Sequence, residues 1–262
     1  MNPRVVILGA VLASTAVSFP ALAQGADGVI VIDQAKAIAG SVTPGDAPGF
    51  PVTINQPGSY RLAGNLSIAA EGVHAVDIVV NGVSLDLNGF TIQGPIACTG
   101  GTPEAIACPA SNVNGVGVRA PNRRFVSVRN GAIRGFGYGI RGGYQSRFEN
   151  LDVAHSGQFG IIAGEGSLIA NSIVFMSYEA GIHSYGDARN NHVSMSGYDG
   201  IRAALGSLVI GNRVDRSGWA GINGNLGGAP TLIDNSVTRA GQYAISNGVN
   251  AGGNTCNGQL CP

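Results

Sequence analysis

Residues 159–203 read FGIIAGEGSLIANSIVFMSYEAGIHSYGDARNNHVSMSGYDGIRA, and a Gly-Ile pair recurs within this stretch. The full column contains Ile140, Ile161, Ile182, Ile201, Ile222 and Ile245, at spacings of 21, 21, 19, 21 and 23 residues. A second column contains Asn150, Asn171, Asn191, Asn212 and Asn235, at spacings of 21, 20, 21 and 23 residues. Repeats of this length are typical of solenoids.

Each repeat contains short runs of β-branched or alternating residues, such as 160–162, 167–169 and 172–174, which Gly, Asn or Ser separates. Such runs are typical of strands joined by bends. A helix is disfavoured, because each Gly would cost it about 1 kcal/mol. We therefore expect three strands and three bends in each repeat, and stacked repeats that form three parallel sheets around an internal ladder of the Ile residues.

The Asn column has a structural explanation. Asn tolerates the left-handed backbone conformation that a bend between strands often needs, and stacked Asn side chains can hydrogen-bond along the solenoid axis. A leucine-rich repeat has a similar length and also an Asn column, but its L-x-x-L-x-L pattern is absent from this chain.

The repeat resembles the right-handed parallel β-helix superfamily, the pectate-lyase-like solenoids. Upstream, residues 56–62 (QPGSYRL) and 83–92 (VSLDLNGFTI) are similar to the opening turns of secreted bacterial right-handed β-helix repeat proteins. The resemblance covers about residues 50–255 and implies an all-β, right-handed parallel β-helix. It implies no particular enzyme, because function depends on the site that a fold carries.

The first residues are typical of a secretory signal peptide. Arg4 precedes a charge-free run from Val5 to Val17, and the segment ends in Ala21-Leu22-Ala23. A basic start, an apolar centre and a small-residue end predict cleavage after Ala23 and a secreted protein, periplasmic or extracellular. A transmembrane anchor is the alternative, but the run is short for a span, and we expect no membrane span in the mature chain.

The four cysteines form two local pairs in the sequence. An even number of cysteines in an exported chain suggests disulfides. Three pairings are possible, and Cys98–Cys108 with Cys256–Cys261 is favoured because each pair brackets a short loop. A zinc site is the alternative, but no His lies near either pair. We expect neither a metal nor another cofactor.

The rest of the chain is expected to cap or decorate the solenoid. We expect the signal peptide at 1–23, a cap and linker at 24–52, the solenoid at 53–255 and a C-terminal cysteine loop at 256–262. The cap contains a short helix that begins after Asp33 and stops at Gly40. Residues 93–114 interrupt the repeat and are expected to form an inserted loop.

Composition excludes several classes of protein. Lys and Arg total 15 and Asp and Glu total 15, so the formal net charge is zero. A nucleic-acid partner is disfavoured, because such a protein needs a basic face. The hydrophobic fraction of 44% is too high for a disordered chain. Gly is abundant, but it does not occupy every third position as collagen requires.

One outward column combines cations with nearby aromatic residues. The residues that follow the ladder positions are Arg119, Arg141, Ile162, His183, Arg202, Asn223 and Ser246. Tyr138, Phe159, Glu179, Tyr198, Asp199 and Trp219 lie just before the Gly-Ile pairs. Aromatic rings stack on sugar faces, and cations pair with uronate carboxylates. We therefore predict a polysaccharide partner, with Tyr138, Glu179, Asp199 and Trp219 as substrate contacts. The alternative is an ordinary solvated sheet.

A polysaccharide lyase is a second hypothesis. β-Elimination needs a group that neutralises the uronate and a base for the C5 proton. Arg141 or Arg202 could neutralise, and His183, with an unperturbed pKa near 6.5, or Tyr198 could be the base. Residues 119–124 match R-x-P-x-x-R, which carries the catalytic arginine in pectate lyases, so the resemblance implies Arg119 as the base.

Other features limit the lyase hypothesis. The W-I-D-H signature of pectate lyases and the paired acids of polygalacturonases are absent. A third hypothesis is a structural surface protein without a ligand.

His155 lies in a bend column with Met176, Met195, Arg216 and Arg239, which is expected to be an outer surface without a functional role. The oligomeric state is not predicted.

Overall fold

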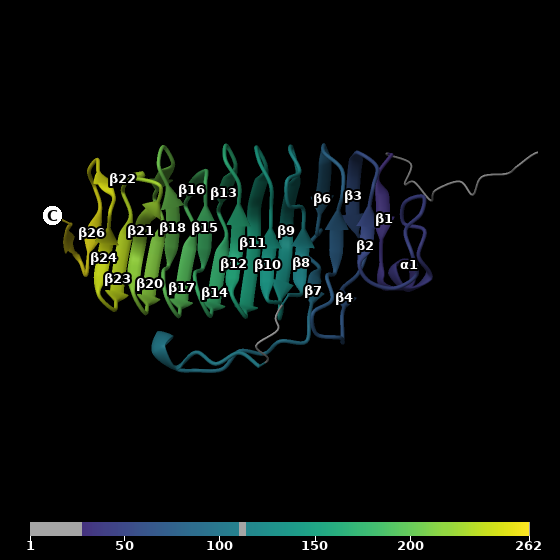
Figure 1. Ribbon diagram of the computed structural model, residues 1–262, viewed down its shortest axis with the longest axis horizontal. Helices are drawn as coiled ribbons and strands as arrows, with labels where there is room; N and C mark the ends of the chain where they lie inside the picture. Colours follow the sequence, from purple (N-terminus) through teal and green to yellow (C-terminus); the bar gives the residue numbers. More distant parts are fainter. Residues whose placement is uncertain (1–27, 110–113, 262) are drawn as a thin grey trace, which may run out of the picture.

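The computed structural model describes residues 28–109 and 114–261, so the predicted signal peptide lies outside the described residues. Figure 1 shows one elongated stack of strands, with a short helix at one end and the C-terminus at the other. Apart from helix α1 (Gln34–Ala39) and one 3₁₀ turn (Pro103–Ala105), the regular elements of the described residues are β-strands. The expected all-β parallel solenoid is confirmed.

One side of the stack is a parallel sheet of nine strands, which contributes one strand to each turn. In spatial order it contains β2 (Val52–Ile54), β5 (Val76–Ile78), β8 (Val116–Arg119), β10 (Tyr138–Arg141), β12 (Phe159–Ala163), β15 (Ile182–Ser184), β18 (Ile201–Ala204), β21 (Ala220–Leu226) and β24 (Tyr243–Ser246).

The other strands form two further ladders, which are connected because β9 (Ser127–Arg134) and β11 (Arg147–Ser156) run through both. The first ladder also contains β1 (Ile30–Ile32), β3 (Gly58–Leu62), β6 (Val83–Asp86), β13 (Leu168–Ala170), β16 (Asp187–Arg189), β19 (Leu208–Ile210), β22 (Thr231–Ile233) and β25 (Val249–Asn250). The second contains β4 (Leu66–Ser67), β7 (Thr91–Gln93), β14 (Ile173–Ser177), β17 (His192–Ser196), β20 (Arg213–Ser217), β23 (Ser236–Ala240), β26 (Thr255–Cys256) and the antiparallel β27 (Gln259–Leu260). Most turns therefore have three strands and three bends, as expected, but the turns of β9 and β11 have two strands, and these long strands join the expected three sheets into two.

The variation in repeat length arises at one bend, between the nine-stranded sheet and the first ladder. Ile161 pairs with Ile182, and Leu168 pairs with Asp187. Leu168 stands seven residues after Ile161, whereas Asp187 stands five residues after Ile182. The short spacing of 19 residues thus reflects a bend that is two residues shorter at Tyr185.

The predicted Ile ladder lies in the core. Ile140, Ile161, Ile182, Ile201 and Ile222 are each 0% exposed, and Ile245, at the last turn, is partly buried. The Gly residues that precede these Ile residues have no side chain, which allows the second ladder to approach closely across the core. A Cβ atom added to Gly160 would lie 2.4 Å from Cγ1 of Val174, which is closer than atoms can pack. The Gly-Ile pair therefore reflects close packing between two sheets.

The predicted Asn column is in fact two adjacent columns. Asn150 and Asn171 have φ values of 56° and 52° and stand at a left-handed bend position, which Asn190 takes in the next turn. The other members, Asn191, Asn212 and Asn235, each stand one position after this left-handed bend position in their own turn, and they are buried. There, the backbone N–H and Nδ2 of each Asn donate to Oδ1 of the Asn in the next turn, over 2.8–3.0 Å, and the ladder ends at Asn254. Axial hydrogen bonding is confirmed, but the two roles belong to different residues.

Both ends of the described chain are closed as the sequence suggests. Asp33 caps helix α1, because its carboxylate accepts from the backbone N–H of Lys36, and Gly40 follows the helix with φ of 75°. The stack already includes β1, which lies upstream of α1 and pairs with β3. At the other end, Cys256 and Cys261 form a disulfide with an S–S distance of 2.00 Å.

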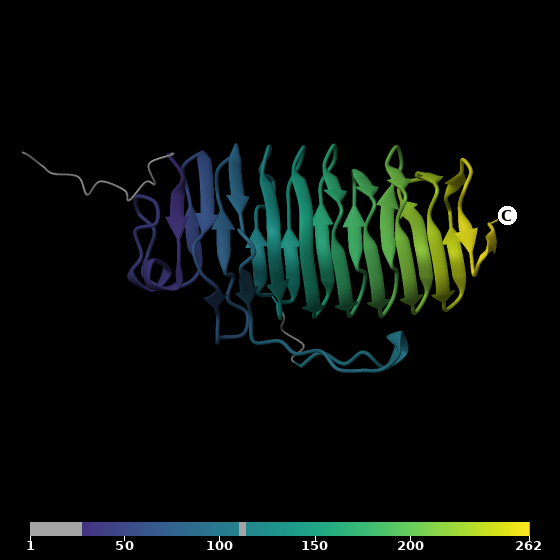
Figure 2. The same cartoon turned by 180° about the vertical axis from the view of Figure 1, so that it is seen from behind.

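The insert lies along the edge of the stack and runs past β14, β17 and β20 (Figures 1 and 2). The sulfur atoms of Cys98 and Cys108 are 2.08 Å apart, so the second predicted disulfide is also confirmed. Met176 and Met195 pack under this insert and are 7% and 2% exposed. His155, in the same column, lies 3.1 Å through Nδ1 from the carbonyl oxygen of Cys98. The expectation that this whole bend column is an outer surface is therefore wrong.

Candidate functional site

The predicted outward column runs across the nine-stranded sheet in the expected register. Arg119 pairs with Arg141, Arg141 with Ile162, and Ile162 with His183. His183 in turn pairs with Arg202, and Arg202 with Asn223. The column also extends to Asp77, which pairs with Arg119.

Two of the three arginines in this column are held by carboxylates. Nη1 of Arg119 lies 3.0 Å from each carboxylate oxygen of Asp77. Nε and Nη2 of Arg202 donate to Oδ2 of Asp199 over 2.8 and 2.7 Å. Asp199 is 0% exposed and also accepts from Nδ2 of Asn223 at 3.2 Å. Asp199 therefore lies beneath the face, where it orients Arg202, and not on the surface as a ligand contact.

Arg141 differs from these two arginines. It is exposed, and no carboxylate pairs with it among the described residues. Its guanidinium carbon lies 5.7 Å from the ring centroid of Tyr138, a cation–π distance. Arg141 is thus an oriented cation that retains its capacity to bind an anion.

The residues that precede the Gly-Ile pairs were expected to form one group, but in the structure they occupy two neighbouring columns. Tyr138 pairs with Phe159, and their rings stack with centroids 6.0 Å apart. Glu179, Tyr198 and Trp219 lie one position earlier, and their backbones bond in series. In that second column the Tyr198 and Trp219 rings stack 5.8 Å apart, whereas Glu179 is partly buried. The aromatic residues therefore form two short stacks.

His183 has a perturbed environment. Its ring lies edge-on to Phe159, with centroids 5.2 Å apart, and its buried Nδ1 atom has no hydrogen-bond partner. Burial, with a further contribution from the charge of Arg202, lowers the pKa of His183 to about 4. The imidazole is therefore neutral at neutral pH, and it is a much weaker base than its ordinary pKa of 6.5 suggests.

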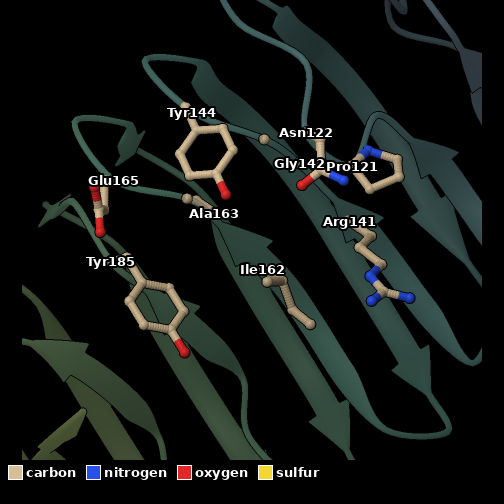
Figure 3. A pocket seen from close by; sticks show the side chains of 11 residues that line it. Pro121, Asn122, Arg141, Gly142, Tyr144, Ile162, Ala163, Glu165 and Tyr185 are labelled. Carbon is tan, nitrogen blue, oxygen red and sulfur yellow. The ribbon is translucent and has the colours of Figure 1, made fainter. Parts of the chain in front are cut away.

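A depression of about 250 Å³ lies where β10 and β12 end and the chain bends. Figure 3 shows Ile162 between Tyr185 and Arg141, with Tyr144 beside them and Glu165 farther from Arg141. Two phenols, an aliphatic side chain and a guanidinium thus surround one hollow. This arrangement can take a sugar ring that carries a carboxylate, because the rings offer apolar surface and the guanidinium offers paired donors.

Sequence reasoning did not identify Tyr144, Glu165 or Tyr185, because they lie beyond the Ile column, where bend length varies. It also missed His74, whose Nδ1 accepts from the backbone N–H of Val116 at 3.2 Å. Burial, followed by the charge of Arg119, lowers the pKa of His74. His74 stands three residues before Asp77, as Tyr138 stands before Arg141, and this offset was the available signal.

Within the described residues, no group of three or more His, Cys, Asp or Glu side chains is arranged to hold a metal ion. The described helices include none that is both long and apolar enough to cross a membrane. No protein-family model matches the sequence, and a search of curated proteins finds no match.

Proposed function

We propose that this chain is a secreted right-handed β-helix protein of the pectate-lyase-like type that binds an acidic polysaccharide on its nine-stranded sheet. Arg141 is the observation that supports this proposal. It is exposed, it stacks on Tyr138, and it borders a depression with two tyrosines. Other arginines in the column, Arg119 and Arg202, already have carboxylate partners.

Two parts of this proposal rest on general arguments. Parallel strands joined by a crossover connection are right-handed in about 98% of proteins, which favours a right-handed coil. Two disulfides favour an oxidising compartment, in agreement with the signal-like first residues.

Affinity electrophoresis of the mature protein tests the proposal. The wild type should be retarded in gels that contain polygalacturonate, and the retardation should decrease with added salt. Arg141→Gln should lose most of this retardation. Arg213→Gln is a matched control, because Arg213 is also exposed and lies on β20, in the second ladder. Equal migration of all three proteins with and without polygalacturonate would contradict the proposal.

Catalysis by β-elimination is a second candidate, which the R-x-P-x-x-R match at Arg119 and the neutral imidazole of His183 favour. It has less support than binding. Asp77 pairs with Arg119, and a base whose conjugate acid has a pKa of about 4 accepts protons poorly at neutral pH. Ultraviolet absorbance from an unsaturated product would establish this activity, and loss of that signal in His183→Gln would assign the base.

A further inference from the structure

The depression beside Arg141 is the first of three that adjoin one another. A second, of about 180 Å³, shares Tyr144 and Glu165 with the first. A third, of about 390 Å³, shares Gly166 with the second. The three hollows therefore follow the chain around the bend, from the nine-stranded sheet to the first ladder.

Each hollow is bordered by an exposed arginine. Arg141 borders the first, Arg124 the second and Arg147 the third. None of these three arginines has a carboxylate partner among residues 28–109 and 114–261. Arg189, which also borders the third hollow, is bound to Asp187. The free positive charges thus follow the hollows around the bend.

The short bend at Tyr185 borders two of the three hollows. Ile182 and Asp187 are five positions apart, whereas the equivalent residues of the preceding turn, Ile161 and Leu168, are seven positions apart. The longer bend beside it contains Glu165 and Gly166, and it borders the first and third hollows together with the short bend. Both ends of the short bend border hollows, since Tyr185 lines the first and Asp187 the third.

We propose that the three hollows form one binding track for a chain of acidic sugars that crosses the bend transversely to the solenoid axis. This inference rests on the proposed function and extends its site beyond the nine-stranded sheet. Successive carboxylates of the polymer pair with Arg141, Arg124 and Arg147, since guanidinium groups bind carboxylates in a bidentate manner.

The track favours a polysaccharide over a nucleic acid. Glu165 borders the first two hollows and is exposed, so its carboxylate can accept hydrogen bonds from sugar hydroxyls. A DNA strand offers few hydroxyl groups to this carboxylate, whereas each sugar of a polyuronate offers at least two. The formal net charge of zero gives no long-range attraction for any polyanion, so recognition rests on these local contacts.

Isothermal titration calorimetry with a short and a long oligogalacturonate tests the track. The double variant Arg124→Gln/Arg147→Gln should bind the long oligomer roughly fivefold or more weakly, the effect expected from two lost exposed charge contacts. Its affinity for the short oligomer should match the wild type, because that ligand occupies the first hollow. Arg141→Gln should weaken both ligands, and Arg213→Gln should weaken neither.

The possible outcomes separate the two proposals. If the double variant binds the long oligomer as tightly as the wild type, the track is refuted while the site at Arg141 stands. If the wild type binds neither oligomer, both proposals fail. If a single-stranded DNA oligonucleotide binds more tightly than the long oligogalacturonate in the same titration, the track binds nucleic acid and the identification of its ligand is wrong.

Discussion

At the scale of single residues, the perturbed pKa of His183 couples folding to pH. Its folded pKa is about 4, below the ordinary value of 6.5. Between these values His183 binds more protons in the unfolded chain than in the folded chain, so its contribution lowers the free energy of unfolding as the pH falls from about 6.5 to about 4. Urea unfolding across this range should show the decrease, and His183→Gln should show a shallower one. An identical pH dependence in the variant would refute the assignment.

The buried Asn ladder makes a second prediction at this scale. Asn212 accepts from the backbone N–H of Asn191 at 2.9 Å and donates to the carbonyl oxygen of Ala188 at 2.9 Å. Asn212→Ala leaves these buried groups without partners, which should cost about 1–3 kcal/mol. Asn171→Gly is the control, because Asn171 is exposed and Gly suits its φ of 52°. Urea unfolding of both variants measures the difference, and equal stabilities would contradict the role of the ladder.

At the scale of the elements, the Ile ladder joins neighbouring strands of the nine-stranded sheet. Ile182 on β15 is 0% exposed and pairs with Ile161 and Ile201. Ile182→Ala should lower the free energy of unfolding by about 2–5 kcal/mol, because it opens a cavity between stacked turns. Ile162→Ala, at a partly exposed outward position, should cost much less. Similar denaturation midpoints for the two variants would argue against the internal ladder.

The elements also show what the sequence could and could not predict. The Gly-Ile column could be recognised because each of its five Gly residues, from Gly139 to Gly221, lies in close contact with a Val of the second ladder. The sequence pattern placed the two Asn columns in one column. The spacing between repeats varies by more than one residue, so a shift of one position could not be recognised. Two of the depressions border the short bend at Tyr185, whose length can be recognised only from the strand register. The pairing of Arg202 with the buried Asp199 depends on side-chain geometry that a repeat pattern does not contain.

At the scale of the whole molecule, stability is a sum over turns that contact their neighbours. The three carboxylate-free arginines of the track all lie within residues 124–147, in the middle of the stack. The insert begins after β7 and reaches the turn of Gly218 through Pro103, but none of its described residues lines the three hollows. Binding and overall length should therefore be separable properties of this protein.

Deletion of one complete turn tests this separation. Removal of residues 202–222 joins Ile201 to Asn223, which occupies the position that Arg202 had, so every column keeps its register. This variant should retain its β-sheet circular dichroism and its binding to polygalacturonate, with a lower melting temperature because one set of stacked interfaces is lost. Removal of residues 202–211 places the remaining strands out of register, so that variant should fail to fold cooperatively. If both deletions were tolerated equally, or if the full-turn deletion abolished binding, the view of the chain as independent stacked turns would be wrong.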